Sequence, residues 1–249
     1  VFVKFGILAI SLAWMTSAQV ALKSVSTNLE KTSSEALFTP IKNPAMPVLN
    51  PSSSAMICRS PNLKYSGKPL SVGAGEKLTL TWDTETKPLL GGDSYMIQGP
   101  CTVYMSSVND SPTGANWFKV YQKAWDATGF WCSQQVNKKP LEITIPADIA
   151  DGDYRIRTEV IDLTNAKGSN AVDPSQGPQF YVNCALITVS GGKDANPPGV
   201  SMTSVYKNLK ALQVDMTDLK AAANYVIPGP PVYTGSEDTT TTTTTENNA

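Results

Sequence analysis

The chain has 249 residues, of which 41% are hydrophobic and 16% are charged, and its formal net charge is −1. This length and hydrophobic content are enough for one large folded domain with terminal extensions. The near-zero net charge argues against a nucleic-acid partner or an acidic membrane surface, whereas a neutral partner such as a glycan suits it.

The first 18 residues have the pattern of a secretory signal peptide. Lys4 supplies a positive charge, residues 5–15 are an apolar run, and Thr16 to Ala18 form a small-residue cleavage site. The apolar run is too short to span a bilayer, since a membrane helix needs about 20 apolar residues. We therefore expect export to the extracellular region or the cell wall, and cleavage after Ala18 leaves Gln19 as the first residue.

The segment from residue 20 to residue 57 is rich in Ser, Pro, Asn and Ala, and only residues 20–26 are a strand candidate. Pro40, Pro44, Pro47 and Pro51 argue against a helix, because proline lacks the N–H that a helix interior needs. We predict a long surface loop that is held against the domain.

From residue 58 to residue 190, short runs of β-branched and aromatic residues alternate with turn clusters, and this pattern predicts strands. The predicted strands cover residues 77–82, 101–105, 117–121, 141–145, 154–163 and 180–189. Helical periodicity is weak and confined to residues 209–223. Many short strands separated by Gly, Pro and Asp turns predict an all-β protein built as a β-sandwich.

The segment 234–249 contains an unbroken threonine run at residues 239–245. It cannot bury apolar surface, so we predict a disordered tail after a domain that spans residues 19–233. Threonine-rich secreted tails are often O-glycosylated stalks, and an unmodified end explains the composition equally well.

The chain has four cysteines, Cys58, Cys101, Cys132 and Cys184. An even number in a secreted protein favours two disulfides, and the sequence by itself leaves three pairings open. There is no CxxC pair and no histidine, so a zinc site is not expected.

Six segments, taken in chain order, resemble the fungal cellulose-active lytic polysaccharide monooxygenases of auxiliary-activity family nine, formerly glycoside hydrolase family sixty-one. They are residues 99–105 (GPCTVYM), 117–121 (WFKVY), 131–146, 154–163 (YRIRTEVIDL), 179–185 (QFYVNCA) and 227–233 (IPGPPVY). The resemblance covers nearly all of residues 19–233. It implies an immunoglobulin-like, fibronectin III-like β-sandwich with long surface loops, and disulfides that pair Cys58 with Cys184 and Cys101 with Cys132.

Enzymes of that family hold one copper ion between two histidines, one of them N-terminal, beside an axial tyrosine. The residues of this chain that match those three ligands are Gln19, Ile97 and Tyr181. Thr164 and Gln179 match the histidine and glutamine of the second sphere. Because imidazole nitrogen suits copper and the chain has no histidine, we predict no copper and no other metal cofactor.

The alternation of side chains along a strand places Gln179 and Tyr181 on one face and Phe180 on the other. The resemblance turns the first face toward the copper position and the second toward the core. Gln179 and Tyr181 then either face a substrate or persist as hydrogen-bonded strand residues. Arg157 and Glu159 also share a face, and we expect them to form a structural ion pair.

Three hypotheses about function follow. The first is a non-catalytic relative, a pseudoenzyme, that associates as a monomer with cell-wall polysaccharide such as cellulose or another β-glucan. Tyr95, Tyr206 and Tyr233 are candidates for stacking on sugar rings. Each also has a structural interpretation as a partly buried tyrosine, which we favour for Tyr233.

The second hypothesis, implied by the resemblance, is an active copper enzyme that cleaves cellulose oxidatively with unfamiliar ligands. The third is a glycosidase that uses two carboxylates about 5–10 Å apart. The candidate acids of the third hypothesis are Asp83, Glu85, Asp151 and Asp153. They lie in or beside predicted turns, where solvation is enough to explain them.

Overall fold

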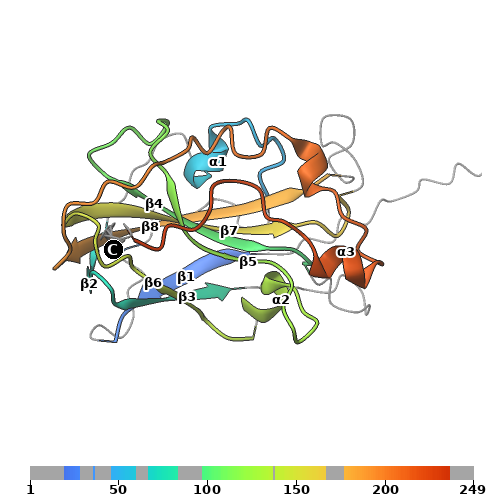
Figure 1. The fold of residues 1–249 in the computed structure, drawn as a ribbon, viewed down its shortest axis with the longest axis horizontal. Coiled ribbons are helices and arrows are strands. Elements are labelled where there is room, and N and C mark those ends of the chain that lie inside the picture. Colours follow the sequence, from blue (N-terminus) through green and yellow to red (C-terminus); the bar gives the residue numbers. More distant parts are fainter. Residues whose placement is uncertain are drawn as a thin grey trace, which may run out of the picture.

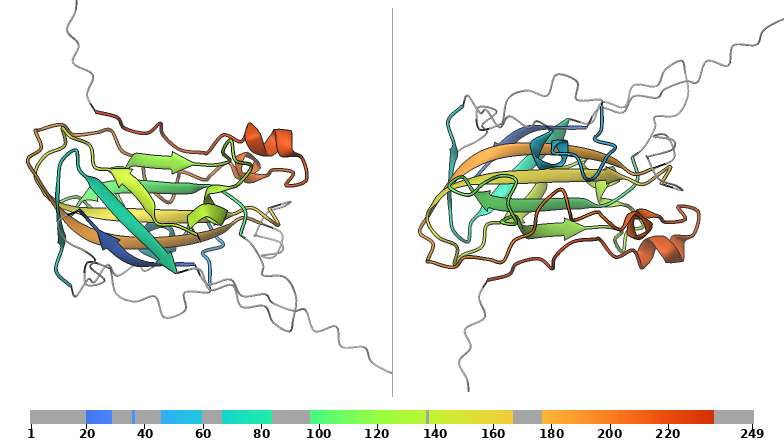
Figure 2. Two further views of the ribbon diagram at one scale, coloured as in Figure 1. Left: turned by 90° about the horizontal axis from the view of Figure 1, so that it is seen from below. Right: turned by 90° about the horizontal axis from the view of Figure 1, so that it is seen from above.

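The computed structural model describes residues 20–28, 36, 46–59, 67–83, 97–136, 138–166 and 177–235. In this part of the chain, two sheets pack face to face as a β-sandwich (Figure 1), and Figure 2 shows the same layers from below and from above. One sheet has three strands in the order β1-β3-β6, and the other has five in the order β2-β8-β7-β4-β5. The predicted all-β sandwich is confirmed.

Seven of the strands coincide with the predicted ones to within a few residues. The strands are β1 (Ala21–Ser26), β2 (Leu70–Gly73), β3 (Lys77–Asp83), β4 (Cys101–Ser107), β5 (Phe118–Lys123), β6 (Leu141–Thr144), β7 (Gly152–Asp162) and β8 (Gln179–Ser190). β2 is not among the strands predicted from the sequence. β2 depends instead on a non-local partner, since it pairs in parallel with the end of β8, with Leu70 opposite Ile187.

The helices in the described part of the chain are short and lie outside the sheets. They are α1 (Ala55–Cys58), α2 (Cys132–Val136) and α3 (Leu219–Ala223), with a 3-10 turn η2 (Leu209–Leu212). The weak helical periodicity of residues 209–223 therefore corresponds to two single turns. The prediction of a helix-free loop up to residue 57 is wrong at its end: Pro51 is the last proline there, so every residue of α1 keeps its backbone N–H.

The disulfides are the two that the resemblance implies. Cys58, at the end of α1, is bonded to Cys184 of β8, and their Cα atoms are 5.5 Å apart. Cys101 of β4 is bonded to Cys132 of α2, with a Cα separation of 5.7 Å. Each disulfide thus attaches a short helix to a long strand.

β7 and β8 form the centre of the larger sheet. They pair antiparallel over their whole length, from Gly152 opposite Val189 to Asp162 opposite Gln179. Nearly all of their residues are buried on both faces. The three-stranded sheet covers one face, and residues 46–59 with the C-terminal segment cover the other. This burial explains why neither strand alternates cleanly between polar and apolar residues.

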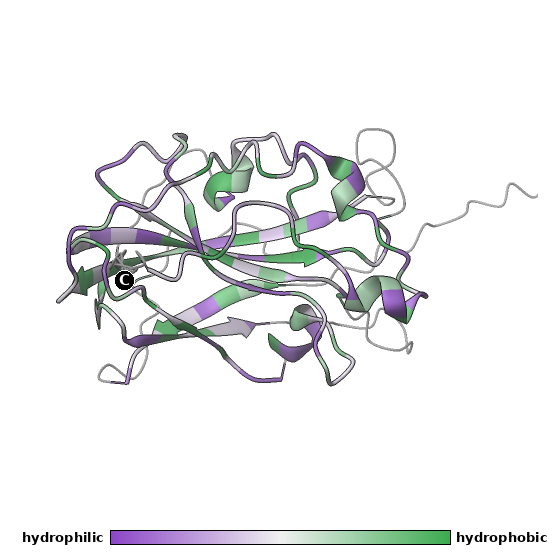
Figure 3. Cartoon of the chain, viewed as in Figure 1, coloured by the Kyte–Doolittle hydropathy of each residue, from purple (hydrophilic) through white to green (hydrophobic). Residues whose placement is uncertain are grey.

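The face between the sheets is almost purely hydrocarbon. Leu78 and Leu80 of β3 are fully buried against Val103, Met105 and the other members of the main core cluster. Figure 3 shows green, hydrophobic stretches on the strands, alternating with purple, hydrophilic ones. Fully burying each such aliphatic side chain contributes about 1.5–3 kcal/mol, so this layer is the main source of stability.

Several predicted features lie outside the described residues: the signal peptide of residues 1–18, Gln19, Glu85, Tyr95 and most of the threonine-rich tail. Within the described ranges, none of the helices has the length and apolar character needed to cross a bilayer.

Candidate functional site

Four of the sequence-predicted site residues gather at one end of the five-stranded sheet. Ile97 precedes β4, Thr164 follows β7, and Gln179 and Tyr181 begin β8. The backbone N–H of Leu163 donates to the carbonyl of Gln98 at 2.8 Å. Together with the pairing of Asp162 with Gln179, this bond places the three segments side by side.

Glycine makes the close approach of these segments possible. A Cβ atom added to Gly99 would overlap the carbonyl oxygen of Ile161, so no other residue fits there without displacing β7. Beside it, the Gly99 N–H donates to the hydroxyl of Ser133 at 3.0 Å, and that hydroxyl donates to the carbonyl of Ile97 at 2.7 Å. The Ser133 side chain therefore holds the backbone of the loop that carries Ile97.

Ile97 itself belongs to the core. Its side chain is 6% exposed and is a member of the main hydrophobic cluster between the sheets. A hydrocarbon side chain has no donor atom for a metal or for a sugar hydroxyl. Its position is therefore explained by packing alone.

Thr164 closes the turn after β7. Its hydroxyl accepts a hydrogen bond from the N–H of Gln98 at 3.3 Å, and its own N–H donates to the carboxylate of Asp162 at 2.9 Å. Both groups of Thr164 are thus engaged in holding the chain, and the turn has the Asx geometry typical of aspartate.

Tyr181 is buried, with 2% of its surface exposed. Its hydroxyl donates to the side-chain oxygen of the half-buried Gln179 at 3.3 Å. The guanidinium of Arg59 lies 5.5 Å from the centre of the Tyr181 ring. Desolvation lowers the pKa of Arg59 to about 10, with the proximity of Tyr181 acting in the opposite direction. Tyr181 belongs to the hydrophobic cluster between the sheets, and Phe180 belongs to the cluster on the outer face, so both faces of β8 are buried. The prediction that the core lies on the Phe180 face and not on the Tyr181 face is therefore wrong.

Arg59 reaches this position because of its backbone. It follows α1 in the left-handed conformation, with φ of 58°. Its N–H donates to the carbonyl of Ala55 at 2.7 Å, which ends the helix. The turn directs the arginine away from α1 and toward the start of β8. No sequence pattern indicates this placement.

The two described tyrosines predicted to face a sugar, Tyr206 and Tyr233, are both engaged in contacts within the fold. Tyr206 is 1% exposed, and its hydroxyl donates to the carboxylate of Glu159, so the prediction that it faces a glycan is wrong. Tyr233 is partly buried: its hydroxyl donates to Asp148 at 2.8 Å, and its ring packs edge-on against Phe118 at 6.0 Å. This matches the structural interpretation favoured for Tyr233. Tyr95 lies outside the described residues.

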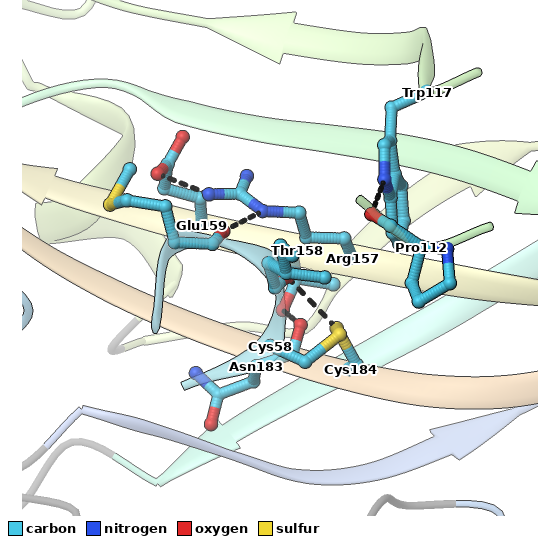
Figure 4. The surroundings of a disulfide bond; sticks show 10 residues. Cys58, Pro112, Trp117, Arg157, Thr158, Glu159, Asn183 and Cys184 are labelled. Atoms are coloured by element: carbon cyan, nitrogen blue, oxygen red, sulfur yellow. Dashed lines mark hydrogen bonds and ion pairs between the residues drawn. A yellow bond between two sulfur atoms is a disulfide. The ribbon is translucent and has the colours of Figure 1, made fainter. Parts of the chain in front are cut away.

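The ion pair predicted between Arg157 and Glu159 is confirmed. The guanidinium lies 2.7 Å from the carboxylate, and both side chains are fully buried (Figure 4). Arg157 also donates to the carbonyl of Met56 at 2.8 Å, and Glu159 accepts a hydrogen bond from Thr102 at 3.0 Å. The pair lies on the outer face of the sheet, away from the face between the sheets.

Two further buried polar residues extend this cluster, and sequence reasoning missed them. Lys119 is 1% exposed and donates to the side chain of Gln122 at 2.8 Å and to the carbonyl of Pro228 at 3.1 Å. The ring of Tyr104 lies between the cations of Lys119 and Arg157, 5.6 and 5.8 Å from its centre. A lysine within a strand is usually solvent-exposed, so nothing in the sequence indicates this burial.

Of the acids of the glycosidase hypothesis, Asp83 lies far from Asp151 and Asp153, and Glu85 lies outside the described residues. Asp83 is the last residue of β3. At the other end of that strand, the N–H of Gly75 donates to the carbonyl of Ile145, which precedes Asp151 in the chain by six residues. The seven residues of β3 separate the two sites by roughly 20 Å. Asp151 accepts the N–H of Gly192 and Asp153 accepts the hydroxyl of Thr188, and both contacts are structural.

Comparison with known proteins gives one consistent result. Residues 15–225 match the model of auxiliary activity family 9, formerly GH61. The chain is 33% identical over 195 residues to AA9 family lytic polysaccharide monooxygenase C of Aspergillus tamarii, which covers 73% of this chain and 50% of that protein. It is 32% identical over 209 residues to monooxygenase E of the same family from Neurospora crassa, covering 76% and 60%. The chain thus spans between half and three fifths of the length of these relatives.

Solved structures agree on the fold. The protein called CvAA9A superimposes with a TM-score of 0.73 at 24% identity, over 86% of this chain and 97% of that one. The extended catalytic domain of LPMO9A from H. jecorina gives a TM-score of 0.68 at 22% identity, over 87% and 91%. At this level of identity the similarity concerns the architecture of the sandwich.

Proposed function

Since the chain belongs to auxiliary activity family 9, we propose that it is a secreted, non-catalytic relative of the lytic polysaccharide monooxygenases that associates with cell-wall polysaccharide. The names of its relatives point to polysaccharide as the partner, and cellulose or another β-glucan is the chemical class we propose. The single observation that carries the loss of catalysis is the absence of histidine from all 249 residues.

The residues at the matching positions do not fit a copper ion. Cu(II) in a protein is best held by imidazole and similar nitrogen donors. Ile97 offers only carbon atoms, and Gln19 offers an amide in place of an imidazole. Tyr181 keeps its phenol, but that hydroxyl already donates to Gln179. One engaged phenol and an amide are a poor donor set.

The charge beside Tyr181 is a second argument against copper. The Arg59 guanidinium lies near this ring, and its pKa of about 10 keeps it protonated at neutral pH. A divalent cation placed at the phenol would be repelled by it, and more strongly than in water because the site is largely buried. In our proposal, Arg59 occupies the neighbourhood in which the family places its metal.

Copper affinity tests this proposal most directly. The mature chain, beginning at Gln19, is titrated with Cu(II) in a calorimeter and examined by electron paramagnetic resonance. We expect no tight, stoichiometric type-2 copper signal. Oxidised sugar ends released from cellulose in the presence of copper and a reductant would contradict the proposal and support the active-enzyme alternative that family membership favours.

A matched pair of variants sharpens the measurement. Ile97→His adds one imidazole at the position of the second family ligand, and Ile97→Val keeps a hydrocarbon side chain. We expect any gain in copper affinity to be confined to Ile97→His. Equal copper affinity in both variants would mean that the metal binds elsewhere on the chain.

Association with polysaccharide is tested separately. The full chain is incubated with insoluble cellulose, chitin and β-glucan, and the retained fraction is measured. Retention on at least one of them is expected, and no retention on any would overturn this half of the proposal. Size-exclusion chromatography and N-terminal sequencing of the exported protein test the proposed monomer and the cleavage after Ala18.

A further inference from the structure

A second candidate site lies at the opposite end of the sandwich. There a pocket of about 500 Å³ opens between the turn after β4, the start of β7 and residues 194–199. β7 begins beside this pocket and ends near Thr164, and its eleven residues separate the two ends by roughly 35 Å. Figure 1 shows β7 and β8 running along the length of the molecule between these ends. The pocket therefore shares no residue with the site described above.

Backbone hydrogen bonds fix the walls of this pocket. Trp117 and Val200 exchange two of them, at 3.2 and 2.9 Å, and these bonds bring residues 196–199 against Asn116. A Cβ atom at Gly199 would overlap the backbone of Asn116, so the contact requires glycine. Arg155 donates to the carbonyls of Ser107 and Val108 at 2.6 and 2.9 Å and so holds the loop on the other side. The pocket is therefore preformed.

The pocket is lined by acidic side chains at its rim and by two aromatic side chains at its base. Asp110, Asp151 and Asp194 are exposed at the pocket, and none of the described residues that line it is lysine or arginine. Phe118 and Tyr154 are buried beneath, packed edge to face at 6.5 Å. Burial raises the pKa of Tyr154, and Asp110 and Asp151 raise it further, which indicates that both carboxylates act on this ring.

The polar groups of the pocket mostly accept hydrogen bonds. Carboxylates at neutral pH are acceptors only. The side-chain oxygen of Asn116 is buried and has no hydrogen-bond partner among the described residues. A ligand that brings donors and positive charge therefore suits these acceptors.

A metal ion does not meet these requirements. Within the described ranges, no three His, Cys, Asp or Glu side chains are close enough together to hold one. The three carboxylates are instead spread around a pocket large enough for an organic molecule. The positive charge of the ligand must be spread in the same way.

We propose that this pocket binds an oligomer of amino sugars whose amines are protonated. Each sugar ring has an apolar C–H face that can contact the parts of Phe118 and Tyr154 that line the pocket. Its hydroxyl and ammonium groups are donors that match the acceptor-rich rim, and ammonium charge neutralises the three aspartates. A neutral glycan would satisfy the hydrogen bonds but would form no ion pair with the carboxylates.

The test compares two ligands with the same sugar backbone, one with charged amines and one with neutral acetamides, and the salt dependence separates the effect of charge from that of the acetyl group. Glucosamine oligomers and their N-acetylated counterparts are titrated into the full chain at a mildly acidic pH at which the sugar amine is protonated. We expect the charged oligomer to bind more tightly and its affinity to fall as salt is added. Equal affinity for both oligomers, or no binding of the charged one, would overturn the proposal.

Variants locate the site. Asp110→Asn combined with Asp194→Asn removes two of the charges while leaving Asp151, which holds Gly192, in place. We expect affinity for the charged oligomer to fall roughly ten- to thirtyfold, as expected for two ion pairs in water. The control Asp83→Asn removes the same kind of exposed charge at the end of β3 and should leave affinity unchanged.

This site stands apart from the proposed function. Failure of the chain to bind cellulose, or discovery of a copper centre, would leave the pocket and its test untouched. Conversely, the Asp110→Asn, Asp194→Asn double variant should keep the retention on β-glucan that the unmodified chain shows. An unchanged affinity of that variant for the charged oligomer would place amino-sugar binding elsewhere and would overturn the assignment.

Discussion

The two faces of the five-stranded sheet differ in the polarity of the side chains that they bury. The face toward β1, β3 and β6 is hydrocarbon, and a lateral row from Phe118 through Met105 and Ile156 to Ala185 runs across four of its strands. A second row of paired residues crosses the same four strands on the outer face, and each of its members is adjacent in sequence to a member of the first row. That row contains Lys119, Tyr104, Arg157 and Cys184.

The difference lies in what covers each face. A sheet supplies hydrocarbon side chains, so apolar burial suffices on the inner face. The outer face is covered by irregular chain, whose carbonyls need donors: Arg157 donates to Met56, and Lys119 donates to Pro228. A covering loop without its own ladder of hydrogen bonds is thus held by buried charges. The following experiments compare the two faces.

The largest effects should come from the disulfides, because one lies on each face. Cys58–Cys184 ties α1 to the outer face and has a sequence separation of 126, whereas Cys101–Cys132 lies in the inner cluster with a separation of 31. Loop-closure entropy alone predicts losses of about 5 and about 4 kcal/mol when each pair is changed to alanine. Urea unfolding measures both. A larger loss for the inner disulfide would contradict the entropic account.

Removing the charge of Glu159 should cost nearly as much. Glu159→Gln keeps the shape but leaves Arg157 buried without a counter-charge, at a cost of about 3–5 kcal/mol. Ile156→Val, the neighbouring position on the inner face, should cost only about 1 kcal/mol. Replacing the pair by Arg157→Met with Glu159→Leu should lose less than Glu159→Gln alone. If the double variant is the less stable one, the charges are net stabilising.

The contrast between the faces also explains which features the sequence could predict. Alternation along β7 places Arg157 and Glu159 together, and their opposite charges indicate a pair. Alternation cannot say that the face they share is buried, because the cover consists of residues far away in the chain. For the same reason Tyr206 is misassigned as a surface tyrosine, whereas Glu159 lies beneath it as an acceptor.

The candidate site shows a similar limit. The resemblance identifies Ile97, Thr164, Gln179 and Tyr181 as neighbours, and strand register places them at one end of the sheet. The approach of Arg59 to Tyr181 depends on a left-handed residue at the end of a four-residue helix. A conformation of that kind is set by tertiary packing and has no signature in local sequence.

Removing the hydroxyl of Tyr206 should have an intermediate effect. Tyr206→Phe deletes one donor to the buried carboxylate of Glu159 and should destabilise the fold by about 2 kcal/mol. Tyr233→Phe removes a partly buried hydrogen bond to Asp148 and should cost about 1 kcal/mol. Thermal unfolding of both variants measures the difference. Equal losses of stability would mean that the buried hydrogen bond from Tyr206 to Glu159 contributes no more than the partly buried one from Tyr233 to Asp148.

The smallest effect should be a change in the pH dependence of stability, and it tests the outer face alone. Desolvation lowers the pKa of Lys119 from 10.5 to about 8, partly opposed by the carboxylate of Glu159. Above pH 8 the unfolded chain therefore binds more protons at this lysine than the folded chain, so this residue makes stability rise with pH.

The increase of stability with pH should continue until the tyrosines of the outer face begin to ionise in the unfolded chain. Tyr104 and Tyr206 have raised pKa values in the folded state, mainly through burial, so stability falls once unfolded tyrosines ionise near pH 10. Between about pH 8 and pH 10, the unmodified chain should thus gain stability relative to Lys119→Met. Parallel pH profiles for the two proteins would mean that Lys119 titrates normally and that the covering segment around Pro228 does not desolvate it.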